Sequence, residues 1–286
     1  MSYKHIEVKP IAGAMGAEIA GVDLSQTLSD EAFQEIHDAF MRHLMIFFRN
    51  QDLNPETEIA FARRFGPLIV DPYVKAHDKY PEMLVIVKEA HEKNAFGESW
   101  HSDSTFLERP PAVSFLHAKE VPEVGGNTMF ANQYLAYETL SDGLKADLLK
   151  LRALHNTSRS YTKAYQTNKY ATRAMQLRDD DVIKEAMTKH VIHPAVRTHP
   201  VTGRKALYVN KTYVINFDGW TEEESLPLVR YLCAHAVRPE FTCELRWEPG
   251  TLAMWDNRCA MHHPINNYHG VRREMHRVVA EGDRPV

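Results

Sequence analysis

The sequence predicts a mainly β protein with helical insertions, built as one domain on a barrel or double-sheet jelly roll. Short runs of strand length, either apolar or alternating, recur along the chain, and only a few segments repeat apolar residues at helical spacing. No internal repeat, low-complexity tract or linker divides the sequence. With 286 residues, 44% hydrophobic and 25% charged, the chain can bury one large core. We therefore expect a single α+β domain spanning 1–286.

The N-terminal part is predicted to open in β-structure and to continue with two helices. Residues 6–11 alternate apolar and polar side chains, as a half-buried strand does. Ser29 can cap a helix whose apolar residues recur at helical spacing as far as Leu44. The apolar run 44–48 overlaps this pattern and predicts a buried strand, so the end of the helix stays open. A second helix is predicted over 55–65, with proline at its start and a glycine after it.

The rest of the chain is predicted to form short strands interrupted by one insertion. An apolar run at 83–87 predicts a strand. Apolar residues recur at helical spacing over 133–152, and a polar region follows to about residue 190. We expect this helix-rich insertion, about 133–190, to form a lid. Further short strands are predicted at 207–209, 241–245 and 251–255. Many short strands with scattered helices favour a barrel or a jelly roll.

The composition argues against nucleic acid and membrane as partners. A formal net charge of -4 provides no global attraction for polyanions. The N-terminus lacks the apolar core of a signal peptide, and no stretch approaches the roughly 20 apolar residues of a membrane span. Cys233, Cys243 and Cys259 form no C-x-x-C pair and are odd in number, which favours a reducing compartment. We expect a cytoplasmic homo-oligomer that acts on a small molecule.

A metal site is predicted where an imidazole and a carboxylate lie two residues apart. On an extended chain, His101 and Asp103 place their side chains on the same face. Two histidines and one carboxylate on one face of an octahedron leave three positions free, the arrangement of non-haem iron(II) oxygenases. The adjacent His262 and His263 can each supply the second imidazole. Only one of them can face a pocket on a strand, and their spacing does not choose between them.

Other interpretations of this triad have to be weighed. With 16 histidines in the chain, an H-x-D triplet arises easily by chance. A zinc hydrolase can also use two histidines and an aspartate, and a non-catalytic binding protein could have kept the fold. A 2-oxoglutarate enzyme differs in needing a cation for the far carboxylate, which arginine holds bidentately. Three arginines follow His262 closely: Arg272, Arg273 and Arg277.

Four ordered motifs resemble the taurine and 2,4-dichlorophenoxyacetate dioxygenase (TauD/TfdA) family. Residues 100–106, W-H-S-D-S-T-F, resemble its W-H-T-D-x-T-F motif, with serine at 102. Residues 125–128, G-G-N-T, resemble G-G-D-T, and residues 255–262 resemble W-D-N-R-x-x-x-H. Residues 273–277 resemble the R-x-M-H-R ending. The resemblance extends from Val8 nearly to the end of the chain.

The resemblance implies a double-stranded β-helix (jelly-roll) core and an Fe(II) centre. By matching positions, His101, Asp103 and His262 are the iron ligands, so the motif selects His262 over His263. The cosubstrates it implies are 2-oxoglutarate and O2, which are converted to succinate and CO2 while a substrate carbon is hydroxylated. The product can fragment if that carbon bears a sulfate ester or an aryl ether.

The resemblance also assigns residues to the two organic acids. Thr128 and Arg273 would hold the distal carboxylate of 2-oxoglutarate. Arg277 corresponds to the residue that grips the acidic group of the primary substrate, although it could instead support Arg273. A carboxylate inside a barrel needs a paired charge, because leaving either partner alone costs roughly 3–5 kcal/mol. Loss of Arg273 should therefore be severe.

The substrate is expected to differ from taurine. Asp71 and Gly97 stand where taurine-specific members have a histidine and an asparagine. An aspartate repels a sulfonate and welcomes an amine, but Asp71 could simply cap a turn beside Pro72. We place Asp71 and Tyr73 among the substrate-binding candidates. Similarity to the phenoxyalkanoate dioxygenases favours an aryloxyalkanoate or another organic acid, with a sulfonate or alkyl sulfate ester as the alternative.

Two further groups of residues carry weaker expectations. Aromatic side chains can line an apolar substrate pocket or serve as ordinary packing. The aromatic candidates are Tyr73, Phe106, Tyr213 and Phe217. Three histidines have no partner at ligand spacing and are predicted to lie in loops or at the surface. They are His193, His199 and His235.

Overall fold

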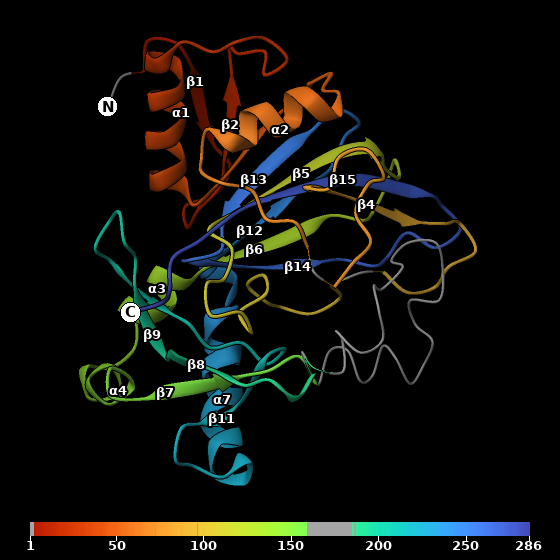
Figure 1. The fold of residues 1–286 in the computed structure, drawn as a ribbon. Coiled ribbons are helices and arrows are strands. Elements are labelled where there is room, and N and C mark those ends of the chain that lie inside the picture. The colour runs from red at the N-terminus through yellow and green to blue at the C-terminus, as the bar shows by residue number, and fades with distance from the viewer. Residues whose placement is uncertain (1–2, 72, 96, 159–184, 186) are drawn as a thin grey trace.

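The computed structural model describes residues 3–71, 73–95, 97–158, 185 and 187–286. A seven-stranded sheet faces a three-stranded sheet, and helices α1 and α2 cover the other face of the larger sheet (Figure 1). In sheet order, the larger sheet contains β1 (Glu7–Pro10), β2 (Ala17–Ala20), β3 (Met45–Phe48), β13 (Leu252–Asp256), β5 (Val113–Glu120), β15 (Arg273–Ala280) and β4 (Met83–Lys88). The smaller sheet contains β12 (Thr242–Leu245), β6 (Thr128–Asn132) and β14 (Ala260–Pro264).

Strands β3 and β13, in the middle of the larger sheet, are buried on both faces, which explains why they carry almost only apolar residues. In β13, Leu252 and Met254 pack toward the helices, whereas Ala253 and Trp255 pack toward the smaller sheet. All four side chains are at most 2% exposed. Successive strand residues point to opposite faces, so a strand between two apolar layers loses the usual alternation of apolar and polar residues.

Helix α1 (Asp30–His43) ends where the two sequence patterns overlapped. Ser29 accepts a hydrogen bond from the Ala32 amide at its start. Leu44 closes the helix in the left-handed conformation, with φ 64°, and β3 begins at the next residue. Helix α2 (Pro55–Arg63) carries a capping box at its N-terminus, formed by Asn54 and Thr57. Both predicted helices are present, and α2 is two residues shorter than expected.

The second part of the chain adds helices and short strands below the core (Figure 1). The predicted helical stretch 133–152 forms two short helices, α3 (Gln133–Glu138) and α4 (Asp142–Leu148). They are followed by two small sheets, β11 (Val214–Phe217) with β7 (Arg152–His155) and β8 (Val191–Pro194), and β10 (Lys205–Leu207) with β9 (Val196–Thr198). Helix α7 (Glu222–Ala236) packs on this region. Residues 159–184 and 186 of the predicted lid lie outside the described residues.

The prediction of loop or surface positions was wrong for His193, which lies in β8, and for His235, which lies in α7; His199 lies in a loop, as expected, but is buried as well. His193, His199 and His235 are buried, with exposed fractions of 1%, 1% and 8%. His193 contacts the Leu107 carbonyl at 2.9 Å, and His199 Nε2 lies 2.9 Å from Asp256 Oδ2. Burial lowers the pKa of His193 to about 4. The partners come from distant segments, so spacing along the chain could not reveal them.

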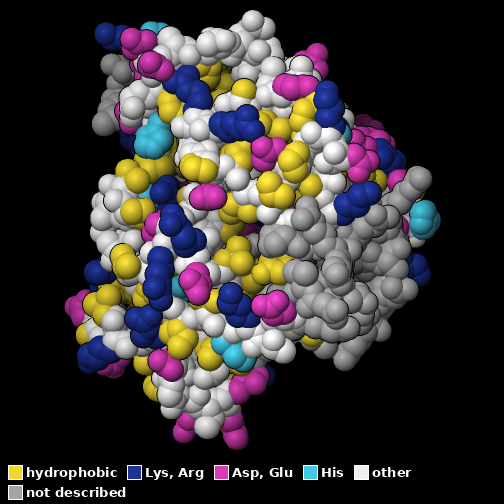
Figure 2. All heavy atoms as spheres, in the orientation of Figure 1, with side chains coloured by type: hydrophobic (Ala, Val, Ile, Leu, Met, Phe, Trp, Pro, Cys, Tyr) yellow, Lys and Arg dark blue, Asp and Glu magenta, His cyan; other side chains and the backbone are white. Residues whose placement is uncertain are grey.

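Other expectations from the sequence have mixed outcomes. Phe217 is fully buried and packs edge-on against Trp220, at 5.5 Å between ring centroids, so the packing alternative holds for it. The three cysteines form no disulfide. Among the described helices, none is long and apolar enough to cross a bilayer. On the face drawn in Figure 2, basic and acidic side chains are interspersed with apolar ones.

Candidate metal centre and active site

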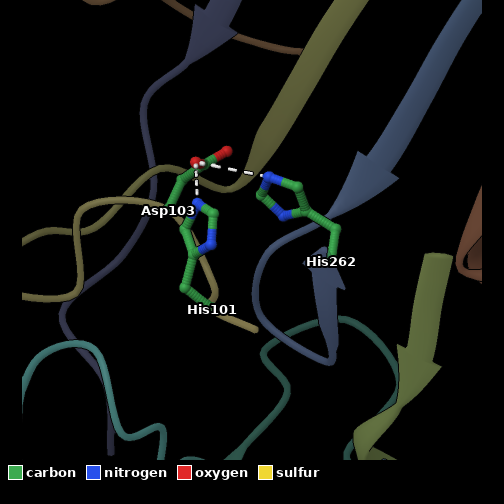
Figure 3. A group of neighbouring side chains, drawn as sticks. All are labelled: His101, Asp103 and His262. Atoms are coloured by element: carbon green, nitrogen blue, oxygen red, sulfur yellow. Dashed lines mark ion pairs between the residues drawn. The ribbon is translucent and has the colours of Figure 1, made fainter. Parts of the chain in front are cut away.

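The H-x-D segment and strand β14 are joined by a short antiparallel bridge. The His101 amide donates to the His262 carbonyl at 3.1 Å, and the His262 amide donates to the His101 carbonyl at 2.8 Å. Residues directly opposite each other in an antiparallel pair point to the same face. Both imidazoles therefore face one space, and Asp103, two residues beyond His101, enters it from the same side (Figure 3).

The geometry of the three side chains fits a metal ion. Asp103 Oδ1 lies 3.6 Å from His101 Nε2 and 3.9 Å from His262 Nε2 (Figure 3). These distances exceed those of hydrogen bonds, whereas an ion about 2.0–2.2 Å from each donor can lie among the three atoms. The three residues are 4–6% exposed. The donor set of two imidazoles and one carboxylate suits iron, because it leaves positions open for other ligands.

His101 is held in the tautomer that a metal requires. Its Nδ1 lies 2.6 Å from the Ser99 carbonyl and donates to it, which leaves the lone pair of Nε2 directed toward Asp103. Gly97 also contacts this ring, because a Cβ at residue 97 would lie 3.2 Å from His101 Cε1. A side chain at this position, with φ +75°, would press on the imidazole. The glycine that departs from the taurine pattern thus lets its loop approach His101.

His262 and His263 differ clearly in their surroundings. The His262 ring packs on Trp255, at 4.7 Å between centroids, and its Nε2 faces Asp103. The His263 ring instead lies over Trp100, at 5.5 Å, and is partly exposed. The structure therefore brings His262, not His263, to the other two residues.

Asp103 is oriented by a hydrogen bond and an ion pair, both to the oxygen that points away from the histidines. Its Oδ2 accepts a hydrogen bond from Ser114 Oγ at 2.6 Å and forms an ion pair with the Arg277 guanidinium at 2.8 Å. Burial alone would raise the pKa of Asp103, but Arg277 and the two imidazoles outweigh it and hold the pKa well below its ordinary value. The carboxylate is therefore ionised and presents Oδ1 to the metal space.

The W-D-N-R motif supports this carboxylate through Asn257. The Asn257 side-chain oxygen accepts from the Trp255 indole at 3.1 Å and from the Asp103 amide at 3.2 Å. Its amide nitrogen donates to Ser114 Oγ at 2.9 Å. Ser114 thus accepts one hydrogen bond and donates another, which fixes its hydroxyl toward Asp103.

Replacing Ser114 by alanine is expected to weaken metal binding by roughly 10- to 100-fold, as losing an outer partner of a metal ligand commonly does. Titration of the anaerobic protein with Mn(II) measures this change. Ser102→Ala is the matched control, because the Ser102 hydroxyl is also buried but donates to the Ala260 carbonyl at 2.8 Å. An unchanged Mn(II) affinity in Ser114→Ala would contradict the positioning role.

A second group of potential ligands, His199, Asp256 and Cys259, is already satisfied without a metal. Asp256 accepts from Arg258 at 2.8 and 2.7 Å and contacts His199 at 2.9 Å. Burial and the charge of Asp256 raise the pKa of the Cys259 thiol well above its ordinary value, so the thiol stays neutral. These contacts hold the end of β13 against the segment after β9, so we assign this group a structural role.

Thr128 and Arg273 both contact one tryptophan, Trp247. The Trp247 indole donates to Thr128 Oγ1 at 3.0 Å, and its ring centroid lies 5.8 Å from the Arg273 guanidinium carbon. Arg273 is 9% exposed, and its buried Nε has no hydrogen-bond partner among the described residues. A buried guanidinium with an unused donor is suited to an anion that enters from outside the chain.

The G-G-N-T segment allows Tyr268 to close this region. Gly126 has φ +69°, and a Cβ there would lie 3.2 Å from the Tyr268 ring and 3.1 Å from Pro122. Its amide donates to the Asn267 side chain at 2.8 Å. The glycine therefore serves close packing beside Thr128, since a larger residue would push Tyr268 away.

Arg277 lies apart from Arg273 and beside a mostly apolar pocket. The two arginines point to the same face of β15 and, four residues apart, are separated by roughly 13 Å along the strand. Arg277 does not contact Arg273, because it pairs with Asp103 instead. The pocket beside it is lined by Ile69, Asp71, Tyr73, Glu82, Leu84, Ser104, Leu107, Pro111, Arg277 and Val279.

Asp71 lines this pocket and also caps a turn. One carboxylate oxygen accepts from the amides of Tyr73 and Val74, at 2.8 and 2.9 Å. The turn-capping alternative is therefore realised, and Asp71 has one oxygen engaged by the backbone. Tyr73 contacts Phe106, which contacts Tyr213, at 5.5 and 5.2 Å between centroids. The three aromatic rings are therefore in contact one after another, and the last of them, Tyr213, lies 6.2 Å from the His101 ring between centroids.

Comparison with known proteins decides the family. The family model described as "Taurine catabolism dioxygenase TauD, TfdA family" matches residues 7–279. The chain belongs to this family. It is therefore a 2-oxoglutarate-dependent dioxygenase. This agrees with the four motifs in the sequence and with the buried Arg273, whose Nε makes no hydrogen bond to a described residue.

Relatives within the TauD/TfdA family act on different organic anions. A sulfate ester dioxygenase of Pseudomonas putida is 33% identical over 98% of this chain and 91% of its own. A 2,4-dichlorophenoxyacetate dioxygenase of Cupriavidus pinatubonensis is 31% identical over 98% of this chain and 99% of its own. The solved structure of a taurine dioxygenase from Burkholderia xenovorans superposes with a TM-score of 0.83 at 32% identity, covering 99% of this chain and 91% of that one. The predicted mainly β fold with a jelly-roll core is confirmed.

The structure adds residues to this TauD/TfdA site that the sequence did not reveal. Ser114 is the second residue of β5, and nothing in its neighbours along the chain distinguishes it. Trp247 and Tyr268 lie outside the four motifs, and no spacing connects them to Thr128 or Arg273. Asn257 could have been singled out from the sequence, because it belongs to the W-D-N-R motif. Its contact with the Asp103 amide, however, depends on the fold.

Proposed function

We propose that this enzyme binds Fe(II) through His101, Asp103 and His262 and hydroxylates a small organic anion at the carbon next to its anionic group. The observation that carries the proposal is the position of Arg277, whose guanidinium lies in a mostly apolar pocket and 2.8 Å from Asp103. An anion bound to Arg277 would lie a few ångströms from the proposed iron ligands. The carbon attached to that anion is then the nearest one to the metal.

The proposed roles of the other residues follow from their contacts. Thr128 and Arg273 would hold the distal carboxylate of 2-oxoglutarate, supported by the Trp247 hydrogen bond to Thr128. When bound, the iron supplies activation of O2 coupled to oxidation of 2-oxoglutarate to succinate and CO2. The chain itself positions both acids, each at its own cation, and shields the reacting groups from water.

The class of the primary substrate is argued from the pocket. Arg277 is its only cation among the described lining residues, and six of the others are apolar or aromatic. This lining suits an anion with an apolar body, such as an aryloxyalkanoate or an alkyl sulfate ester. Asp71 has one oxygen committed to a turn and Glu82 pairs with Arg63 at 2.7 Å, so neither is a dedicated amine contact.

Succinate release tests the proposal and the substrate class together. Aryloxyalkanoates, alkyl sulfates and sulfonates should be compared for stimulation of succinate formation in the presence of Fe(II), 2-oxoglutarate and O2. A zinc-dependent hydrolase using the same triad is the rival from another class, and turnover with zinc and without O2 would establish it instead. A homo-oligomer, a cytoplasmic location, a single domain and a lid at about 133–190 stay predictions from the sequence.

Replacing Arg277 by alanine is expected to raise the KM for the primary substrate by roughly 30-fold or more, because truncating one partner of a buried charge pair costs about 2–5 kcal/mol. The KM for 2-oxoglutarate should change far less. Steady-state kinetics with each substrate varied in turn measures both. Arg272→Ala is the matched control, since Arg272 is partly exposed and pairs with Glu120 and Glu274. Equal increases in both KM values would show that Arg277 serves the cosubstrate.

A further inference from the structure

Lys88, the last residue of β4, is a buried lysine whose ammonium forms no ion pair with a described residue. It is 5% exposed, and its Nζ makes neither a hydrogen bond nor an ion pair with any residue that the structure describes. Lysines are almost never fully buried unless they are paired, because an ammonium removed from water loses strong hydration. Lys88 therefore needs an explanation that the family motifs do not give, since none of the four includes it.

Lys88 stands directly beside Arg273. The two residues are partners in the antiparallel register of β4 and β15, so their side chains leave the sheet on the same face. Both cations lie over one ring: Lys88 Nζ is 4.3 Å from the Tyr268 centroid, and the Arg273 guanidinium carbon is 5.9 Å from it. The tyrosine face attracts both charges but provides no countercharge.

Placing two buried cations side by side is unfavourable in the protein alone. Burial lowers the pKa of Lys88 below its ordinary value, Glu92 and Glu98 raise it partly back, and Arg273 lowers it further. Arg273 also has a buried Nε with no hydrogen bond to a described residue. Two adjacent cations with unused donors are suited to an anion that can accept from both.

A carboxylate meets this requirement. It has two oxygens with about four acceptor positions, so it can accept from a guanidinium, an ammonium and a hydroxyl at once. We propose that Lys88 is a second cation for the distal carboxylate of 2-oxoglutarate, donating from Nζ while Arg273 and Thr128 hold the same group. This inference rests on the proposed role of Arg273 and extends the cosubstrate site to a residue of the edge strand β4.

A structural role for Lys88 is the competing explanation. Glu92 and Glu98 follow β4 in the chain, and Lys88 could hold that segment in place through them. However, neither carboxylate forms an ion pair with Lys88. Glu92 Oε2 accepts from the Glu89 amide at 2.9 Å, and the buried Glu92 Oε1 has no hydrogen-bond partner among the described residues. The cosubstrate explanation accounts for the unpaired ammonium, whereas the structural explanation leaves it unpaired.

Binding measurements on Lys88→Met separate the two explanations. The anaerobic protein loaded with Mn(II) is titrated by calorimetry with 2-oxoglutarate and with 2-oxopentanoate, a 2-oxo acid that lacks the distal carboxylate. We expect the Kd for 2-oxoglutarate to rise about 10- to 100-fold, the equivalent of one hydrogen bond to a charged group, and the Kd for 2-oxopentanoate to stay unchanged. Lys119→Met is the matched control, because this lysine of β5 donates to the Leu53 carbonyl at 3.1 Å.

Thermal unfolding without metal or cosubstrate provides the second readout. Removing an unpaired buried ammonium should raise the Tm of Lys88→Met by roughly 2 °C or more. A fall in Tm, together with equal changes in the two Kd values, would overturn the proposal in favour of the structural role. Glu92→Gln should leave the Kd for 2-oxoglutarate unchanged, and an increase matching that of Lys88→Met would also count for the structural role.

Arg273→Ala distinguishes failure of this inference from failure of the site. If Arg273→Ala weakens 2-oxoglutarate binding and Lys88→Met does not, only the role of Lys88 is refuted. If both variants bind 2-oxoglutarate as the unmodified protein does, the distal carboxylate binds elsewhere, and the proposed cosubstrate site is wrong as a whole.

Discussion

Replacing Asp103 by alanine is expected to abolish the iron-dependent decarboxylation of 2-oxoglutarate. Asp103 supplies the only carboxylate among the three converging side chains, and its charge is fixed by Ser114 and Arg277. Without it, two neutral imidazoles remain to hold a dication in a buried site. Metal affinity should therefore fall by more than the roughly 10- to 100-fold typical of an outer partner. Succinate formation and Mn(II) titration measure the two effects.

The design of this experiment has to separate chemistry from folding. Asp103→Ala leaves Arg277 buried without its partner, which costs roughly 3–5 kcal/mol of stability. Asp103→Asn keeps the side-chain volume and one oxygen that can accept from Ser114 and Arg277. We therefore expect it to fold better than Asp103→Ala, and it should be measured alongside that variant. Asp71→Ala removes a carboxylate in the neighbouring pocket and should leave 2-oxoglutarate decarboxylation largely intact. If folded Asp103→Asn retains iron-dependent turnover at the unmodified rate, the proposed ligand set is wrong.

Arg273→Ala is expected to raise the KM for 2-oxoglutarate by roughly 150- to 5000-fold. This magnitude follows from the cost of leaving one partner of a buried ion pair alone, about 3–5 kcal/mol. Arg273 is 9% exposed and its guanidinium lies against Trp247 and Tyr268, so little water is available to replace it. Kinetics with 2-oxoglutarate varied at saturating Fe(II) and primary substrate provides the measurement.

Arg273→Lys adds information about geometry. It keeps the charge but loses the planar fork, so we expect an intermediate KM if a bidentate carboxylate contact matters. An increase confined to the KM of the primary substrate would place that substrate, not 2-oxoglutarate, at Arg273. Together with Arg277→Ala, these variants assign each cation to one acid.

Local parts of the fold were predictable because their physics is local. Ser29 caps α1 through an amide three residues away, and Asn54 caps α2 in the same way. The boundary between α1 and β3 was not predictable. It depends on Leu44 adopting a left-handed conformation, which the pairing of β3 with β13 accompanies. A strand buried on both faces and a helix end look alike in the sequence.

The site shows the same division between local and distant contacts. His101 and Asp103 share a face because they are two residues apart, and the family motif pointed to His262. The structure separated His262 from His263 through the backbone bridge to His101, which joins segments more than 150 residues apart. The burial of His193 and His199 was not predicted for this reason, since their partners come from elsewhere in the chain.

The sequence by itself determined the family, the two helices of the N-terminal part and the chemical identity of the proposed ligands and anchors. Only the tertiary structure decided which atoms meet: Ser114 with Asp103, Trp247 with Thr128, and Lys88 with Arg273. The physical reason is strand register. A side chain's neighbours across a sheet are fixed by which residues pair between distant strands, and a shift of one residue would send each side chain to the other face.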